Sequence, residues 1–559
     1  MRATTGSGFA AAVLLIVLTA TAAMGDPGLV YETTIEGYYL SAGTGLTTDE
    51  AGNAYVTARY IGDHGENNFV VARLDASGEV VWTTEVEGHN HDVAGDLVLD
   101  GLGRLLITGW TDSDDFPTTP DAMDATLTGF RDVFLMKLSP VDGSIVYSTL
   151  LGGDYTDEGH GLALNDEGEI YIVGTTGSTD FPTVDAYQSE PSAPLYIYTD
   201  VFITRLSPDA KVIRYSTYFG GFEDDTGGKI GLDADGNIII AGGTNSDDLP
   251  LVDAVSLTPN DMFVSKLSAD GSALLFSTYF GGEDDDALAA MVVDAEGHAY
   301  LTGSTRSIGL PTTLGAYQYE LVGEINGCQT YFPVTFFNCD DVFVTKMATD
   351  GTGLVYSTYV GGTHIEEARD IAVDSGGRAH VVGYTTSDDF PGGGTSSASV
   401  FLSQLDADGA NLGYTVFKQS GSANAGGAVA VDEHGSAYMS GAINVPADIY
   451  VAKSGSGQLS GVDDATVGGL RLHQNNPNPF NPSTHIAFEL PVAGPVSMRV
   501  LDASGRLVRT LLDDERPAGA HAVRWDGTDG SGLPVASGVY FYRVEAAGEV
   551  LSQRMILLK

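Results

Sequence analysis

The sequence predicts an all-β chain built from a repeat of four strands. A phrase of Asp or Asn, two residues, Gly and then a short apolar run occurs seven times, between other runs that alternate apolar and polar residues. Such period-2 runs, rich in β-branched and aromatic residues and bounded by Gly, Pro and Asp, indicate strands. The seven phrases open at Asp49, Asp100, Asn165, Asp233, Asp294, Asp374 and Asp432.

Two further sequence patterns also occur seven times each. Alternating runs follow each opener at Phe69–Leu74, Val133–Leu138, Val201–Leu206, Met262–Leu267, Val342–Met347, Val400–Leu405 and Ile449–Ser454. Aromatic-Ser-Thr runs follow these at Val146–Gly153, Arg214–Gly221, Leu275–Gly282 and Val355–Gly362, with weaker versions at Val81–Gly88 and Gly413–Ser420. The seventh such run, Tyr31–Gly37, stands before the first opener.

Seven four-stranded repeats of roughly 60 residues fit a seven-bladed β-propeller over residues 26–454. We expect the strand before each Asp turn to be innermost and the aromatic-Ser-Thr strand to be outermost. The last repeat lacks its fourth strand, whereas Tyr31–Gly37 is a spare copy. Pairing this N-terminal strand with the last blade would close the ring and remove an open sheet edge.

The first 25 residues predict an export signal. Arg2 is followed by an apolar run from Phe9 to Ala23 and by small residues that allow cleavage near Asp26. A membrane anchor is the alternative, but this run is shorter than the ~20 residues that a span needs. We therefore expect a secreted or outer-cell-surface protein with no transmembrane segment in the mature chain.

The two cysteines, Cys328 and Cys339, both lie in a long insertion of the fifth repeat. An exported chain can oxidise such a pair, so we expect a disulfide that closes a small loop. A metal pair is the alternative, but it lacks further Cys or a matching His nearby.

Acidic residues outnumber basic residues by 75 to 26, which gives a net charge of −49. Residues 470–559 contain nine of each kind, so the preceding residues carry the whole excess. Such a field disfavours nucleic acid and anionic lipid as partners, and it favours cations, basic surfaces or simply solubility.

A linker rich in Gly, Ser and Asp, residues 455–469, separates the repeats from a different module at 470–559. Alternating runs predict six strands in this module, which suits a small antiparallel β-sandwich. The runs are His485–Leu490, Val496–Leu501, Leu507–Leu511, His521–Trp525, Val539–Val544 and Leu551–Leu557.

The phrases Asn476–Thr484, Leu501–Leu511 and Ala536–Arg543 resemble the C-terminal sorting domain of type IX secretion cargo. That domain also resembles the immunoglobulin-like domain of flagellar hook-capping proteins. The resemblance implies an address that outer-membrane secretion machinery reads, and that is cleaved or exchanged for an anchor; a generic accessory sandwich stays open. The motif residues are Asn478, Pro479, Phe480, Asn481, Pro482, Gly538 and Tyr540.

A second resemblance concerns the repeats. The phrases Ser113–Thr118, Ser178–Thr183, Ser246–Leu251 and Ser387–Pro391 share a Ser-x-Asp-Phe/Leu-Pro pattern, which is similar to the bacterial seven-bladed propeller repeat family. The first repeat lacks this phrase, and the seventh has only Asn444-Val-Pro446. The family implies the fold and no agreed activity.

Eight residues before each opener stands a side chain that can accept hydrogen bonds. The seven are Ser41, Asp92, Asp157, Asp225, Asp286, Glu366 and Asn424. Because Ser and Asn share the register with acids, we expect caps that bind backbone N–H groups of Gly-Gly turns. The alternative is a calcium site at Asp92, Asp157, Asp225, Asp286 and Glu366, since calcium prefers oxygen ligands. We expect no other cofactor.

These acids lie on the face of the disc that collects the long loops, where we expect ligands. His89, His91, His160 and His364 also fall there, either as a transition-metal site or as ordinary surface histidines. The sequence lacks the zinc-protease, phosphate-loop and nucleophile-elbow motifs.

Three functions stay open. The first is an exported scaffold that binds a glycan or protein on the long-loop face. The second is a secreted carbohydrate hydrolase or lyase that uses carboxylates on that face. The third is a structural part of a surface layer. Tyrosines that could stack on sugars occur at Tyr187, Tyr196, Tyr198, Tyr317, Tyr319 and Tyr331.

Overall fold

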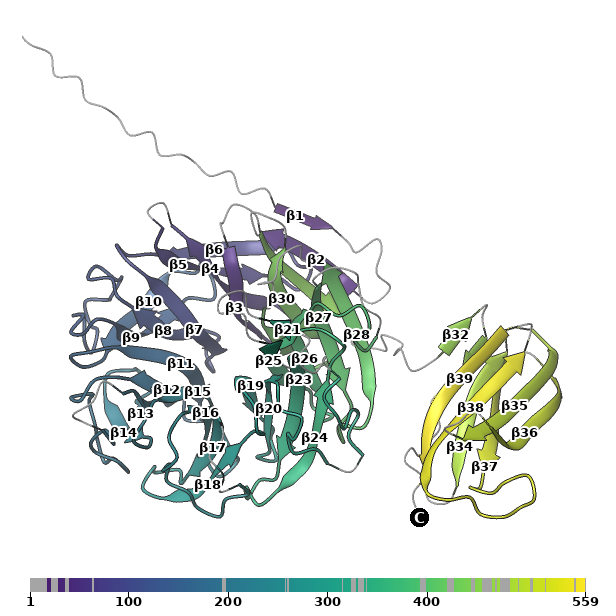
Figure 1. Ribbon diagram of the computed structural model, residues 1–559. Helices are drawn as coiled ribbons and strands as arrows, with labels where there is room; N and C mark the ends of the chain where they lie inside the picture. Colours follow the sequence, from purple (N-terminus) through teal and green to yellow (C-terminus); the bar gives the residue numbers. More distant parts are fainter. Residues whose placement is uncertain are drawn as a thin grey trace, which may run out of the picture. The chain divides into compact units, whose positions relative to one another are not determined.

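The structure is a computed structural model in which the chain divides into two compact units (Figure 1). The first holds Met1–Asn411 and Val416–Leu459, and the second holds Leu412–Thr415 and Ser460–Lys559. The structure describes residues 18–21, 29–35, 40–62, 65–193, 198–256, 258, 261–313, 315–322, 328–329, 336–337, 339–392, 399–419, 427–443, 448–454, 465–467, 470–472, 483–490, 492–502, 506–517, 519–546 and 549–557. The regular elements within these ranges are all β-strands. No helix capable of spanning a membrane occurs in them.

The repeat region consists of antiparallel sheets, which we number in chain order. Sheet one is β3 (Leu40–Thr48), β4 (Ala54–Ile61), β5 (Asn67–Leu74) and β6 (Val80–Val86). Sheet two is β7 (Asp92–Leu99), β8 (Leu105–Thr111), β9 (Asp132–Leu138) and β10 (Ile145–Leu151). Sheet three is β11 (Asp157–Leu164), β12 (Ile170–Thr176), β13 (Asp200–Leu206) and β14 (Ile213–Phe219).

The next three sheets repeat this order. Sheet four is β15 (Asp225–Leu232), β16 (Ile238–Thr244), β17 (Met262–Leu267) and β18 (Leu274–Phe280). Sheet five is β19 (Asp286–Val293), β20 (Ala299–Thr305), β23 (Asp341–Met347) and β24 (Leu354–Val360). Sheet six is β25 (Glu366–Val373), β26 (Ala379–Thr385), β27 (Ser399–Leu405) and β28 (Leu412–Gln419).

Sheet seven combines the two ends of the repeat region. It contains β29 (Val429–Val431), β30 (Ala437–Ile443) and β31 (Asp448–Ser454), and its order continues from β31 to β2 (Leu29–Ile35) and β1 (Leu18–Thr21). β2 pairs antiparallel with β31, so that Ile35 lies opposite Ile449. Tyr31 and Ile35 are buried in one core with Val56 and Val70 of sheet one. The strand from the N-terminal side thus covers the edge that β31 would otherwise expose.

The first strands of the sheets contact one another in sequence. β3 contacts β7, β7 contacts β11, β11 contacts β15, β15 contacts β19, β19 contacts β25, β25 contacts β29 and β29 contacts β3. In Figure 1 the sheets accordingly succeed one another around a common centre. Buried side chains fill the space between neighbouring sheets; Phe69 of sheet one, for example, stacks on Phe134 of sheet two at 5.5 Å between ring centroids.

The insertion of sheet five lies between β20 and β23. Its described part includes the short pair β21 (Cys328–Gln329) and β22 (Phe336–Phe337). A disulfide joins Cys328 to Cys339, with 5.2 Å between their Cα atoms. Cys339 is buried and lies two residues before β23, so the insertion is tied to the sheet at that point.

The second unit holds two four-stranded antiparallel sheets. One has the order β32 (Ala465–Val467), β33 (Leu470–Leu472), β34 (Thr484–Leu490) and β37 (Gly519–Trp525). The other has the order β36 (Leu507–Arg516), β35 (Gly494–Asp502), β38 (Gly538–Ala546) and β39 (Glu549–Leu557). Both sheets contribute to a single core around Trp525, so they pack face to face. The six strands that the sequence predicts in this module form β34 to β39.

Two short strands lie inside the predicted export signal and the predicted linker. β1 lies inside residues 1–25, the predicted export signal, and pairs with β2. β32 lies inside residues 455–469, the predicted linker, and pairs with β33. Alternating Thr and apolar residues give both segments strand propensity, and in each case a neighbouring edge is available. The remaining residues of the signal and of the linker lie outside the described ranges.

Candidate functional site

The Asp-x-x-Gly phrases are tight turns at one edge of each sheet. In sheet four, Gly236 donates its N–H to the Asp233 carbonyl at 2.9 Å, and its φ of 78° suits glycine. Asp233 Oδ1 also accepts the N–H of Asn237 at 2.8 Å. The opposite edge carries the connections between sheets and those between second and third strands, and we call it the long-loop face.

On the long-loop face, the five acids at the beginning of β7, β11, β15, β19 and β25 repeat one hydrogen-bond pattern. Asp157 Oδ2, for example, accepts the N–H of Gly153 at 2.7 Å and the hydroxyl of Ser178 at 2.9 Å. The glycine donors are Gly88, Gly153, Gly221, Gly282 and Gly362, at 2.6–2.7 Å. The serine donors are Ser113, Ser178, Ser246, Ser307 and Ser387, at 2.6–3.2 Å.

This geometry is that of turn caps. The acids Asp92, Asp157, Asp225, Asp286 and Glu366 are all buried, and they satisfy N–H groups of the turn between successive sheets. The turn needs glycine, because a Cβ on Gly152 would lie 2.7 Å from Asp132 Oδ1 and 2.9 Å from Asp157 Oδ2. The side chains of Ser41 and Asn424, which share the register, lie outside the described part of the chain.

Burial raises the pKa of these carboxyls, and their hydrogen bonds oppose this only in part. The pKa is raised to about 6 for Asp92, Asp157 and Asp225. It is also raised for Asp286 and Glu366. A second buried acid heads β13: the pKa of Asp200 is raised to about 7 by burial and then by the charge of Asp225. The turn between sheets three and four therefore brings two protonatable carboxyls together.

The Ser-x-Asp-Phe/Leu-Pro phrase also stabilises these turns, through the side chains of its Ser and Asp residues. Its serine binds the buried acid, and Asp180 accepts the N–H of Asp154 at 2.8 Å. Phe181 is buried and donates its N–H to the hydroxyl of Tyr218 at 3.0 Å. Tyr218 belongs to the Tyr-Ser-Thr-Tyr run of β14, so the phrase links the outermost strand to the turn. Each motif of the repeat therefore has a structural partner in another motif.

The five acids do not come together as metal ligands in the described part of the chain. A group of three ligand atoms within 4.8 Å of one another is formed instead by His89, Asp114 and Asp115, all exposed. The other histidines of the long-loop face are spread over several sheets. His91 Nδ1 accepts the N–H of Asn67 at 2.8 Å, and His160 Nδ1 lies 2.6 Å from the Gly227 carbonyl.

A charged cluster lies on the first strands, deeper in the first unit. Lys229 Nζ of β15 is 3.5 Å from Asp96 Oδ2 of β7. Burial lowers the pKa of Lys229, but the charges of Asp96 and Asp370 outweigh it, and the net shift is upward. Burial raises the pKa of Asp370 to about 6, although Lys229 opposes this. One cation thus joins sheets two, four and six.

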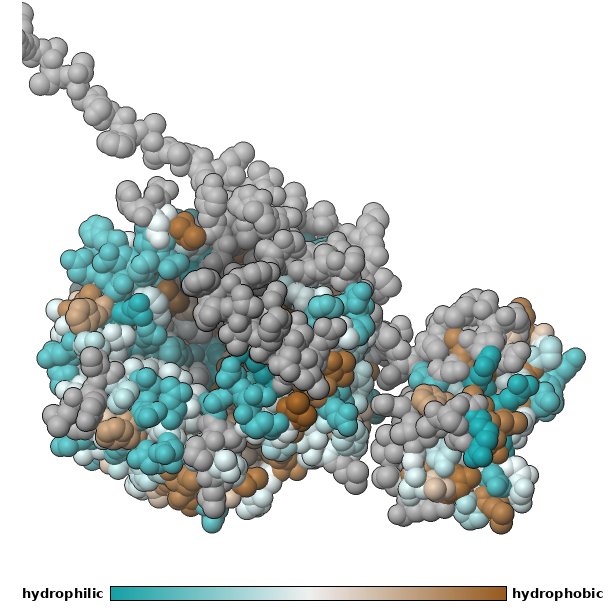
Figure 2. Space-filling view, in the orientation of Figure 1, coloured by the Kyte–Doolittle hydropathy of each residue, from teal (hydrophilic) through white to brown (hydrophobic). Residues whose placement is uncertain are grey.

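Exposed aromatic pairs occur on the long-loop face between neighbouring sheets. Phe130 and Tyr155 meet edge to face at 5.2 Å between centroids, at the junction of sheets two and three. Tyr198 and Phe222 meet at 6.1 Å, at the junction of sheets three and four. All four side chains are exposed, Phe130 by 67%. Where it is coloured, the face seen in Figure 2 is mainly hydrophilic with small separate apolar groups.

The aromatic residues named from the sequence are only partly confirmed as exposed. Tyr187, Tyr198 and Tyr319 are exposed, whereas Tyr317 is half-buried. Tyr196 and Tyr331 lie outside the described residues.

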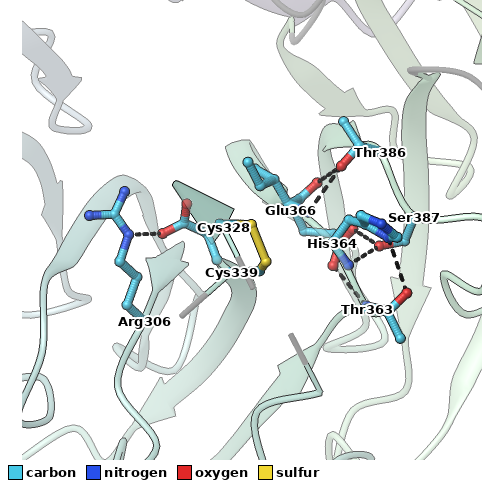
Figure 3. Close-up of a disulfide and its surroundings, with 11 residues drawn as sticks. Arg306, Cys328, Cys339, Thr363, His364, Glu366, Thr386 and Ser387 are labelled. Atoms are coloured by element: carbon cyan, nitrogen blue, oxygen red, sulfur yellow. Dashed lines mark hydrogen bonds and ion pairs between the residues drawn. A yellow bond between two sulfur atoms is a disulfide. The ribbon is translucent and has the colours of Figure 1, made fainter. Parts of the chain in front are cut away.

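A cavity of about 340 Å³ opens between sheets five and six. Arg306, Asp340, Glu367 and Arg369 contribute charged groups to its lining, and alanines contribute much of the rest. Arg306 Nε lies 2.7 Å from Asp340 Oδ1. Figure 3 shows Arg306 on one side of the disulfide and the hydrogen-bonded group around Glu366 on the other. Sequence patterns could not reveal this cavity, because its residues come from four separate segments.

Sequence reasoning also missed one repeat of the serine phrase. Ser307-Ile-Gly-Leu-Pro311 makes the same contacts as its counterparts: Ser307 binds Asp286, and Leu310 donates its N–H to Tyr359 at 3.0 Å. The aspartate of the pattern is Gly309 here, which hid the match. The spacing of 21 residues between Asp286 and Ser307 would have revealed this phrase, because the other repeats have the same spacing between the buried acid and the serine.

Parts of the chain match known families. Residues 146–182 and 355–391 match the model of the β-propeller repeat. Residues 475–549 match the model of the FlgD Ig-like domain. The repeat family and the immunoglobulin-like module expected from the sequence are therefore present in these segments.

Individual proteins show more distant similarity. The regulatory protein FlaEY of Caulobacter vibrioides is 27% identical over an alignment of 256 residues, which covers 42% of this chain and 25% of that relative. The chain thus spans about a quarter of the relative's length. One similar solved structure is PorZ, an essential bacterial surface component of the type IX secretion system of Porphyromonas gingivalis. PorZ is 12% identical to this chain with a TM-score of 0.31, and the match covers 94% of this chain and 73% of PorZ. A protein of unknown function from Dyadobacter fermentans is 12% identical with a TM-score of 0.37, over 76% of this chain and 98% of that protein.

Proposed function

We propose that this protein is an exported, secreted or cell-surface β-propeller that binds a glycan or protein ligand on its long-loop face. One observation carries the proposal. Buried carboxyls hold the turns of that face in five consecutive sheets, and exposed aromatic pairs join residues of these turns to neighbouring loops, as Tyr155 does with Phe130. Rigid loops that present aromatic side chains lose little conformational entropy on binding, which favours a recognition surface.

We further propose that sheets one to seven are the blades of a closed seven-bladed ring. Two observations support closure: β2 pairs with β31, and β29 of sheet seven contacts β3 of sheet one. A closed ring leaves no long sheet edge unpaired. It also places the connecting loops of all blades around one mouth, where a ligand can contact several blades at once.

Export is the second part of the proposal. Residues 1–25 would direct the chain across the inner membrane, and residues 470–559 would be read by outer-membrane secretion machinery. The match of residues 475–549 to an immunoglobulin-like family supports the module but not its role as an address. Asn478–Pro482 of the proposed motif lie outside the described residues, whereas Tyr540 is buried and packs edge to face on Trp525 at 5.2 Å.

The binding function is tested with the full chain on a glycan array, together with an assay for newly released reducing ends. Binding without release supports the proposal, and absence of binding to both glycans and surface proteins contradicts it.

Export is tested by fusing residues 470–559 to a reporter in a bacterium with a type IX system. Reporter retained in the periplasm would exclude the address role.

A carbohydrate hydrolase or lyase is the second candidate function. The observation that favours it is the presence of Asp340 and Glu367 in one cavity, because glycosidases use two carboxyl groups. Each of these carboxylates is paired with an arginine, but burial outweighs Arg306 and raises the pKa of Asp340, as a general acid requires. Release of reducing ends that is lost in an Asp340→Asn variant would establish the hydrolase.

A further inference from the structure

At the cavity between sheets five and six, small side chains stand where sheet two has a large one. Ser304 of β20 lies opposite Ala287 of β19 in the sheet register. The equivalent pair in sheet two is Trp110 and Val93. There the indole is also covered by Arg131, whose guanidinium carbon is 4.1 Å from the ring centroid. The same backbone position is therefore filled at one junction and open at the other.

The charged groups of the cavity are arranged as pairs. Arg306 Nε lies 2.7 Å from Asp340 Oδ1, and Arg369 Nη2 donates to Glu367 Oε2 at 2.6 Å. A second contact joins Arg306 Nη1 to the exposed Asp285 at 2.8 Å. The two arginines and the two lining acids cancel in formal charge. The lining thus offers charged hydrogen-bonding groups without a net charge.

Such a lining selects against ions. A ligand with a net charge would lose hydration on entry and would meet groups that are already paired, so its desolvation would not be offset. A neutral ligand with several hydroxyl groups avoids this cost. Its hydroxyls can donate to the carboxylates and accept from the guanidinium groups, and hydrogen bonds to charged groups are stronger than those between neutral ones.

The volume limits the size of the ligand. A cavity of about 340 Å³ is at the lower end of the ~300–1,000 Å³ that is usual for small-molecule sites. We propose that this cavity binds one neutral sugar ring of a glycan. The inference rests on the binding function proposed above and names the ligand class and the place where it binds.

The walls of the cavity are held in place before any ligand arrives. Asp340 directly follows Cys339, which the disulfide joins to Cys328. The carbonyl of Asp340 accepts the N–H of Glu366 at 2.8 Å, which ties sheet five to sheet six beside the cavity. A preorganised wall lowers the entropic cost of binding.

The test compares three forms of the full chain: the unchanged protein, Ser304→Trp and Ser304→Ala. Ser304→Trp places in the cavity the side chain that sheet two has at the equivalent position, whereas Ser304→Ala keeps the cavity open. Binding of neutral monosaccharides and short neutral glycans is measured by titration calorimetry, and melting curves check that each form is folded. We expect Ser304→Trp to weaken binding about tenfold or more, equal to ~1.4 kcal/mol or more, and Ser304→Ala to change it less than about twofold.

Arg369→Ala is a second variant, which tests the polar contacts without filling the cavity. It should weaken binding of a neutral sugar and leave folding intact, because Arg369 is partly exposed. This variant also replaces Ser304→Trp if the tryptophan prevents folding.

The outcomes separate this inference from the proposed function. Glycan binding that survives both Ser304→Trp and Arg369→Ala but is lost in Phe130→Ala overturns the cavity site and retains the binding scaffold. A preference for uronic or sialic acids overturns the neutral class. Absence of any glycan or protein ligand overturns both proposals. Sugar cleavage that is lost in Ser304→Trp supports the cavity as the sugar site and replaces the binding scaffold by the hydrolase.

Discussion

The backbone N–H of Asp154 donates a hydrogen bond to Asp180 Oδ1 at 2.8 Å, although the two residues are 26 positions apart. The same contact joins His89 to Asp115, Phe222 to Asp248 and Thr363 to Asp389. Together with the buried acid, it holds these four turns of the long-loop face from two sides. A surface built in this way keeps its shape while the exposed residue types vary.

The first prediction concerns the buried caps. Asp157→Ala should lower the free energy of unfolding by ~1–3 kcal/mol, because the N–H of Gly153 and the hydroxyl of Ser178 lose their buried acceptor. Asp154→Ala at the exposed neighbouring position should change it by less than ~0.5 kcal/mol. Urea denaturation measures both. Equal effects of the two substitutions would contradict the cap role.

The second prediction concerns pH. The folded-state pKa of Asp157 is about 6, above the ordinary 3.8, so its contribution to stability is fully present below about pH 4 and is lost as the pH rises through 6. The unfolding free energy of the unchanged chain, minus that of Asp157→Asn, should therefore fall between pH 4 and pH 7, by ~3 kcal/mol at most.

Asp374 supplies a control of opposite sign. Burial raises its pKa, but His380 and the N–H of Arg378 outweigh burial and lower it to about 2. Its contribution is therefore present above pH 4 and is lost as the pH falls toward 2. Denaturation series for Asp157→Asn and Asp374→Asn should show differences of opposite slope. Parallel slopes would refute the assignment of the raised pKa to Asp157.

The third prediction concerns the cluster that joins three sheets. Lys229→Met should lower the free energy of unfolding by ~2 kcal/mol, because Asp96 and Asp370 then repel each other. This loss is smaller than for a fully buried ion pair, because about a fifth of the Lys229 and Asp96 side chains is exposed. Changing Asp370 to Asn in the same chain should restore part of the loss. Thermal melting measures these effects, and Lys211→Met, at a surface pair with Asp121, serves as the control. No loss for Lys229→Met would mean that the cluster does not join the sheets.

The fourth prediction concerns calcium. Each of the five buried acids accepts hydrogen bonds from a glycine N–H and a serine hydroxyl, and the five do not come together as metal ligands in the described part of the chain. Removal of calcium by a chelator should therefore leave the melting temperature unchanged, although Oδ1 of Asp157, Asp225 and Asp286 has no hydrogen-bond partner among the described residues. Addition of millimolar calcium should also leave it unchanged. A ligand that binds only the folded chain must raise the midpoint, so a reproducible rise would revive the calcium interpretation.

Local patterns determined much of the fold. The seven Asp-x-x-Gly phrases and the alternating runs were sufficient to predict an all-β chain with sheets of four antiparallel strands, since the period of two reflects how side chains alternate across a strand. The spare run Tyr31–Gly37 also pointed to β31, because the last repeat lacks one strand. The common register of Asp92, Asp157 and their counterparts likewise predicted turn caps, because all seven residue types can accept hydrogen bonds.

Only the tertiary structure decided where charges and space come together. Asp96, Lys229 and Asp370 are separated by more than a hundred residues of chain each, and no local pattern links them. The cavity is lined by Ser304, where the equivalent position of sheet two has Trp110, and by groups from two different sheets. Strand periodicity is a property of neighbours in the chain, whereas an open volume and an ion pair between sheets are properties of packing.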